Sequence, residues 1–141
     1  MRFLTDEMRP KPDVAATVEG HDHSDVKTLF VLNDPAYGTE RSYNGLRLAH
    51  ALAKRPGEEV RIFLLADAVT CAVAGQQTPN GYYNLERMLG AALHHGAEIG
   101  LCGTCMDARA IREDQLIDGT RRSTLEELTD WTLWADKVVS F

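Results

Sequence analysis

The stretch Thr28-Leu29-Phe30-Val31-Leu32 decides the fold of this chain. A short continuous run of apolar residues is typical of a β-strand that is covered on both faces. Val60 to Leu65 repeats the pattern, and Glu98 to Leu101 repeats it more weakly just before a cysteine. Gln115 to Asp118 and Lys137 to Phe141 read as two further short strands. We therefore expect about five strands.

Helical patterns separate these strands. Apolar side chains recur three and four positions apart, as on the core-facing stripe of a helix. Thr39 and Asp67 can cap the first two helices, and Asn84 opens the third. Ser123 and Thr124 each stand three residues before a glutamate, which is the pattern of a capping box. The predicted helices are residues 39–55, 68–74, 84–96 and 124–134.

Strands that alternate with helices indicate a parallel sheet with helices on both faces. The sequence thus predicts an α/β fold, a three-layer α/β/α sandwich around a mainly parallel sheet of about five strands. The chain has 141 residues, of which 44% are apolar and 26% charged. This is the composition of one globular domain, and the length suffices to bury a core without metal or disulfide support.

Residues 1–25 differ from the rest of the chain. They contain two prolines, two histidines and scattered charges, with little periodicity. We expect residues 1–25 to be a flexible N-terminal extension and residues 26–141 to be the folded domain. His21-Asp22-His23 could bind a metal ion, but a solvated linker is the preferred interpretation, because two ligands in a flexible segment make no closed site.

Charge and cysteine content narrow the function. A net charge of −6 repels phosphate backbones, so nucleic acid is not an expected partner. No apolar run reaches the roughly 18 residues that a membrane span needs. The chain has three cysteines, an odd number, which argues against a secreted disulfide framework and favours the reducing cytoplasm. The glycine-rich nucleotide-binding motifs are absent from the sequence, and we expect no cofactor.

Cys102-Gly103-Thr104-Cys105 is the sharpest motif. It follows the third predicted strand, and ligands of open α/β sheets bind beyond the carboxyl ends of the strands. Three interpretations compete: a redox or sulfur-carrying pair, half of a zinc site, and two inert core thiols. A structural zinc site needs four ligands, and no second paired motif supplies the others.

Other polar side chains could line the same pocket. Asn33, Asp34, Tyr37 and Arg41 follow the first strand, and Arg41 could hold an anion or stabilise a thiolate. Asn-Asp-Pro is also ordinary turn chemistry, with Arg41 solvated at the start of a helix. Cys71 lies in an almost wholly apolar segment, which favours a packed thiol over a third sulfur near the pocket.

Several separated blocks together resemble the DsrE/DsrF-like family. The blocks are Leu-Asn-Asp-Pro-Ala-Tyr-Gly-Thr-Glu-Arg at 32–41, Asp-Ala-Val-Thr-Cys-Ala-Val at 67–73 and Cys-Gly-Thr-Cys-Met-Asp-Ala-Arg at 102–109. The resemblance covers residues 26–141. It implies a parallel α/β/α sandwich that assembles into dimers, trimers or hexamers, and cytoplasmic sulfur handling in which a cysteine accepts sulfur as a persulfide.

The resemblance also implies roles for individual residues. The active cysteine of the sulfur-relay members directly follows the third strand, a position that Cys102 matches. Cys105 occupies a position that is often not cysteine in those members, and it would act as a resolving thiol or protect against over-oxidation. We expect Cys102 to be the most reactive thiol, Cys105 to be less exposed and Cys71 to react slowest.

Two functions follow, and they belong to different classes. The first is a sulfur-relay or thiol-redox protein with Cys102 as acceptor, Cys105 as resolving thiol and Thr104 in the pocket. Its partners would be sulfur donor and acceptor proteins or small thiols. The second is a non-catalytic oligomeric protein that binds a small ligand.

Overall fold

A computed structural model describes residues 25–141. The prediction of a flexible extension, and the possible metal ligands at 21–23, concern residues outside this part. The longest helix within it has 13 residues, and none of its helices is long and apolar enough to cross a membrane.

Five strands and six helical segments alternate along residues 25–141. The strands are β1 (Val26–Leu32), β2 (Glu58–Leu64), β3 (Glu98–Cys102), β4 (Thr120–Ser123) and β5 (Lys137–Ser140). The α-helices are α2 (Arg41–Ala53), α3 (Leu85–His94), α4 (Gly103–Asp107) and α5 (Leu125–Trp134). Two 3₁₀ helices, η2 (Ala66–Ala72) and η3 (Glu113–Gln115), complete the set.

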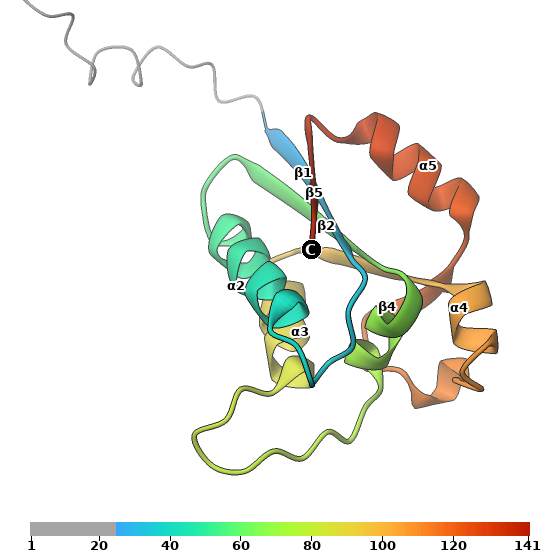
Figure 1. Ribbon diagram of the computed structural model, residues 1–141. Helices are drawn as coiled ribbons and strands as arrows, with labels where there is room; N and C mark the ends of the chain where they lie inside the picture. The colour runs from blue at the N-terminus through green and yellow to red at the C-terminus, as the bar shows by residue number, and fades with distance from the viewer. Residues whose placement is uncertain (1–24) are drawn as a thin grey trace, which may run out of the picture.

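The five strands form one parallel sheet in the order β4-β3-β2-β1-β5. Helices α2 and α3 lie on one side of this sheet and α5 lies on the other (Figure 1). The predicted three-layer α/β/α sandwich with a five-stranded parallel sheet is confirmed. Because the strands are parallel, the carboxyl ends of β1, β2, β3 and β4 all lie on the same side of the molecule.

The apolar residues divide between the two sides of the sheet. The larger cluster joins side chains of β1, β2 and β3, such as Phe30, Ile62 and Leu101, to α2, α3 and η2, and Cys71 of η2 belongs to it. The smaller cluster faces α5 and consists of Leu29, Phe63, Cys102 and Trp131. The Phe63 and Trp131 rings meet edge to face at 5.9 Å. Cys71 and Cys102 therefore belong to different layers.

Two of the predicted caps are present. The Asn84 side chain accepts a hydrogen bond from the Arg87 N–H, and Thr124 accepts one from the Glu127 N–H. The prediction for Thr39 is wrong: Glu40 occupies the N-cap position of α2, and the Thr39 hydroxyl donates to the Asp34 carboxylate instead.

Residues 65–72 differ from the predicted capped helix. The segment is a 3₁₀ helix over Ala66–Ala72 with Leu65 at its N-cap, and Asp67 lies inside the first turn. Ala66 has a φ of 49°, in the left-handed region that residues with a Cβ seldom occupy. This bend lets the chain leave β2 and start η2 directly.

The fourth strand was expected at Gln115 to Asp118, and that prediction is wrong. The strand is Thr120–Ser123, whereas Gln115 ends η3. Leu116 and Ile117, which suggested a strand, instead pack against the larger cluster, and Leu116 makes an isolated bridge to Val73. Leu116 and Ile117 therefore belong to a loop that covers the larger cluster next to η2.

Candidate functional site

A hollow of about 180 Å³ lies where β3 and β4 end. Cys102 is the last residue of β3, and Ser123 is its register partner at the end of β4. We call this cavity the Cys102 hollow. Its lining residues are Cys102, Gly103, Thr104, Arg122, Ser123, Thr124 and Leu125.

Cys102 lines this hollow and is 9% exposed. Its Sγ and the Thr104 Oγ1 share a hydrogen bond of 3.2 Å. Burial raises the pKa of the Cys102 thiol. Hydrogen bonds from the Thr104 hydroxyl, the Cys105 thiol and the backbone N–H groups of Cys105 and Thr104 outweigh burial, so the pKa lies below its ordinary value. The site therefore favours the thiolate, which is the nucleophilic form of cysteine.

Cys105 lies in the first turn of α4 and is more exposed than Cys102, contrary to the expectation from the sequence. Its Sγ accepts a hydrogen bond of 3.2 Å from the Ala66 N–H. Burial and the neighbouring Cys102 raise the pKa of Cys105, although the Ala66 N–H and Arg109 act in the opposite direction. Cys102 is therefore the thiol that ionises first.

An ion pair holds the turn that follows α4 against η2. Arg109 donates from Nε and Nη2 to the Asp67 carboxylate at 3.0 and 2.8 Å, and from Nη1 to the Cys105 carbonyl at 3.0 Å. Together with the Ala66 N–H, these bonds fix Cys105 from two sides. The sequence analysis did not assign Asp67 or Arg109 to the site.

Arg122 is the functional residue that sequence reasoning missed. Its guanidinium donates to both carboxylate oxygens of Asp107 at 2.7 and 2.9 Å. It also lies flat against Gly103, because a Cβ added there would stand 2.8 Å from its Cζ and Nε. No sequence signal pointed to it, because only the register of β4 against β3 puts Arg122 beside Leu101.

Cys71 lies on the other side of the sheet and is completely buried. Burial raises its pKa to about 12, despite an opposing hydrogen bond with Ser42. Its Sγ contacts the Asp34 carbonyl oxygen at 3.8 Å. This environment fits the packed-thiol interpretation and does not bring Cys71 into the Cys102 hollow.

The residues after β1 organise their own loop. The Asn33 amide donates to the Phe141 carbonyl at 3.1 Å, and the Tyr37 hydroxyl donates to Gln76 at 2.7 Å. Arg41 has a side chain that is 74% exposed and approaches Asp34 at 3.8 Å. None of Asn33, Asp34, Tyr37 and Arg41 lines the Cys102 hollow, so the cation beside Cys102 is Arg122.

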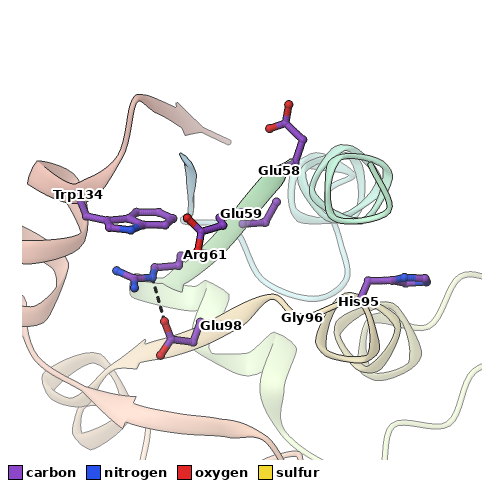
Figure 2. Close-up of a pocket in the computed structure, with 8 residues that line it drawn as sticks. Glu58, Glu59, Arg61, His95, Gly96, Glu98 and Trp134 are labelled. Atoms are coloured by element: carbon purple, nitrogen blue, oxygen red, sulfur yellow. Dashed lines mark ion pairs between the residues drawn. The ribbon is translucent and has the colours of Figure 1, made fainter. Parts of the chain in front are cut away.

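A larger hollow of about 350 Å³ lies at the opposite edge of the sheet. There Arg61 pairs with Glu98 at 2.9 Å and stacks on Trp134, with 3.9 Å between the guanidinium and the ring centroid. Figure 2 shows Glu58 and His95 directed away from this pair. This hollow contains no cysteine and lies at the amino ends of the strands, whereas ligands of open α/β sheets bind beyond the carboxyl ends. We therefore place the candidate site at the Cys102 hollow.

The zinc alternative needs further ligands beside Cys102 and Cys105. Within residues 25–141, no group of three or more His, Cys, Asp and Glu side chains is arranged to hold a metal ion. All three cysteines are free thiols.

The fold and the site define a small α/β/α protein with two cysteines at the carboxyl end of a parallel strand. Residues 26–141 match the model of the DsrE/DsrF-like family, and this chain belongs to that family. It is 43% identical to protein YchN of Escherichia coli over 116 residues, which cover 82% of this chain and 98% of YchN. An uncharacterized protein of Methanopyrus kandleri is 38% identical over 117 residues, or 83% of this chain and 94% of that protein.

Solved structures agree with this assignment. The crystal structure of YchN from E. coli superposes with a TM-score of 0.75 at 42% identity, covering 82% of this chain and 99% of YchN. A protein of unknown function from Methanobacterium thermoautotrophicum shares the fold, with a TM-score of 0.66 at 11% identity over 83% of this chain and all of that one.

Proposed function

We propose that this protein carries sulfur as a persulfide on Cys102, in a sulfur-relay or thiol-redox reaction. The DsrE/DsrF-like family is generally related to sulfur relay, which supports the class of chemistry. The observation that carries the proposal is the surroundings of the Cys102 sulfur, where four hydrogen-bond donors lower the pKa despite burial. Such a thiolate attacks disulfide and persulfide sulfur.

The loading step is a transfer of one sulfur atom. The Cys102 thiolate attacks the outer sulfur of a donor persulfide, R–S–SH, and forms a new S–S bond. The S–S bond of the donor breaks, and R–S⁻ leaves with the electron pair. The products are the Cys102 persulfide and the donor thiolate, so charge and atoms balance.

Cys105 offers a second step. Its thiolate attacks the Sγ of the Cys102 persulfide, forms the Cys102–Cys105 disulfide and expels HS⁻. The two cysteines are oxidised and the carried sulfur is reduced to hydrosulfide. An external dithiol would return the pair to the reduced state. Transfer of the outer sulfur to an acceptor thiolate is the other exit and needs no reductant.

Mass spectrometry of protein purified without reductant tests the proposal. We expect one added sulfur atom on the peptide that contains Cys102, and its loss in Cys102→Ser. Cys105→Ser should accumulate the loaded form or a mixed disulfide, because the resolving thiol is missing. Loading that survives Cys102→Ser but not Cys105→Ser would show that the two cysteines have the reverse roles. Loading that is lost only in Cys71→Ser would show that the sulfur-carrying site is not the Cys102 hollow.

The second candidate is a non-catalytic protein that binds a small ligand. The low exposure of Cys102, at 9%, is the observation that favours it. Thiol titration of the native protein separates the two functions, because rapid alkylation of Cys102 at neutral pH is expected only of the sulfur carrier. Two inert thiols would favour the binding protein.

Self-association belongs to this proposal as well. Leu125 and Leu133 on α5 are 71% and 82% exposed, and Val138 on β5 is 50% exposed. Large exposed apolar side chains on one helix and its neighbouring edge strand are typical of subunit contacts. We expect a dimer or larger species by light scattering, and a monomer at micromolar concentration would contradict this.

A further inference from the structure

Arg122 supplies the Cys102 hollow with a fixed positive charge. Its guanidinium lies against Gly103 and is held by both oxygens of Asp107. Negative charge on Cys102 contributes to the raised pKa of Arg122, so the two groups act on each other electrostatically. Cys102 and Arg122 both line the hollow, so the guanidinium is close to any small molecule that occupies it.

The guanidinium has donors to spare. A guanidinium carries five N–H groups, and Asp107 accepts from one on Nη1 and one on Nη2. No other hydrogen bond from the Arg122 side chain is found among residues 25–141, which leaves three N–H groups for another acceptor. A planar guanidinium of this kind suits a carboxylate.

The size of the hollow limits what can enter. At about 180 Å³ it is smaller than the roughly 300–1,000 Å³ of pockets that hold drug-sized ligands. The reacting molecule is therefore a small one, with its anionic group a few bonds from the sulfur that reaches Cys102.

We propose that Arg122 selects an anionic small-molecule sulfur donor, the persulfide of a carboxylate-bearing thiol, for reaction at Cys102. This inference rests on the proposed sulfur carriage. Arg122 binds the carboxylate while the outer sulfur of the persulfide meets the Cys102 thiolate. The S–S bond of the donor breaks, and the carboxylate-bearing thiolate leaves with the electron pair, as in the loading step above.

Two alkylating agents of similar size, one anionic and one neutral, test the selection without any sulfur transfer. Iodoacetate carries a carboxylate and iodoacetamide is neutral, and both react with the same thiolate. We measure the rate of each at Cys102 by peptide mass spectrometry and take their ratio. In Arg122→Gln the ratio of iodoacetate to iodoacetamide should fall about three- to five-fold, the size expected of a partly exposed charge pair. In Arg122→Lys much of the ratio should remain.

Arg121→Gln is the matched control. It removes the same charge from the neighbouring residue of β4, but Arg121 pairs with Glu127 at 2.7 Å on the α5 side and does not line the hollow. Its ratio should stay at the wild-type value. A fall of equal size in both variants would overturn the proposal, because it would reflect net charge alone.

A donor comparison tests the sulfur chemistry itself. The persulfide of 3-mercaptopropionate should load wild-type Cys102 faster than that of 2-mercaptoethanol, which replaces the carboxylate with a hydroxyl group, and Arg122→Gln should remove the difference. Equal loading in the wild type would overturn selection of the donor. If neither donor loads while the alkylation ratio still depends on Arg122, sulfur carriage fails and anion recognition stands.

Discussion

Cys71 and Cys102 are the same amino acid on opposite sides of one sheet, and their chemistry differs. Both have little solvent exposure, at 0% and 9%. Burial is the largest single effect on each sulfur, yet the pKa of Cys71 is raised to about 12 while that of Cys102 is lowered. The difference lies in the four donors around Cys102. Hydrogen bonding, more than exposed area, decides which thiol ionises.

The largest expected effect is in the reaction rates of these two thiols. Only the thiolate reacts, and three units of pKa correspond to a factor of about 1,000 in the thiolate fraction. A thiolate of lower pKa is also a weaker nucleophile, which offsets about half of this factor on a logarithmic scale. We expect iodoacetamide to modify Cys102 at least about 30-fold faster than the fully buried Cys71 in the native protein at neutral pH. Peptide-resolved mass spectrometry measures both rates, which should converge in urea. Similar native rates would remove the basis of the comparison.

The next effect is on stability at alkaline pH. Folding raises the pKa of Cys71, so the protonated thiol stabilises the native state below its unfolded pKa and this contribution is lost as the pH rises toward 12. Relative to Cys71→Ala, wild-type protein should lose about 2.5 kcal/mol of unfolding free energy between about pH 9 and pH 11. Urea titrations across this range test it, and parallel curves for the two proteins would contradict it.

Serine substitutions should have opposite consequences at the two sites. Cys71→Ser buries a hydroxyl in the α2/α3 side of the core and should cost roughly 2 kcal/mol in urea unfolding, with alkylation of Cys102 unchanged. Cys102→Ser lies at the edge of a hollow with Thr104 as a hydrogen-bond partner, and its stability should change by less than half of that. Equal destabilisation by both variants would contradict the assignment of Cys71 to the closed core and of Cys102 to the hollow.

The smallest effect sharpens the account of Cys102. Thr104→Val removes one hydrogen bond to the sulfur, worth about 1 kcal/mol, which is less than one unit of pKa. The pH profile of alkylation should move upward, and the rate at neutral pH should fall about three- to five-fold. Thr129→Val is the control, because its hydroxyl donates to the Leu125 carbonyl on α5. An unchanged profile in Thr104→Val would exclude this hydroxyl as a source of the low pKa.

The central strands could be predicted from the sequence because burial on both faces demands apolar residues. β1 and β2 have neighbours on both sides in the sheet, and both were recognised as apolar runs. β4 was not, because it is an edge strand of sequence Thr-Arg-Arg-Ser, paired only with β3. Its polar side chains reach solvent or ion-pair partners, so the apolar pattern is missing.

Only the residues of the candidate site that are close together in the sequence could be predicted. Cys102, Thr104 and Cys105 lie within four residues that follow a recognisable strand. Arg122 reaches the same hollow through the pairing of β3 with β4, which no local pattern reveals. Arg41 was the sequence-based choice for the cation, but it begins α2 and its side chain extends into solvent.

The left-handed backbone at Ala66 has a consequence for observing this protein. The bend directs the Ala66 N–H at the Cys105 sulfur. Formation of a disulfide or a persulfide at the pair would change the charge and the lone-pair direction that this proton meets. The amide resonance of Ala66 in the NMR spectrum of ¹⁵N-labelled protein is therefore a built-in indicator of the oxidation state of the two cysteines.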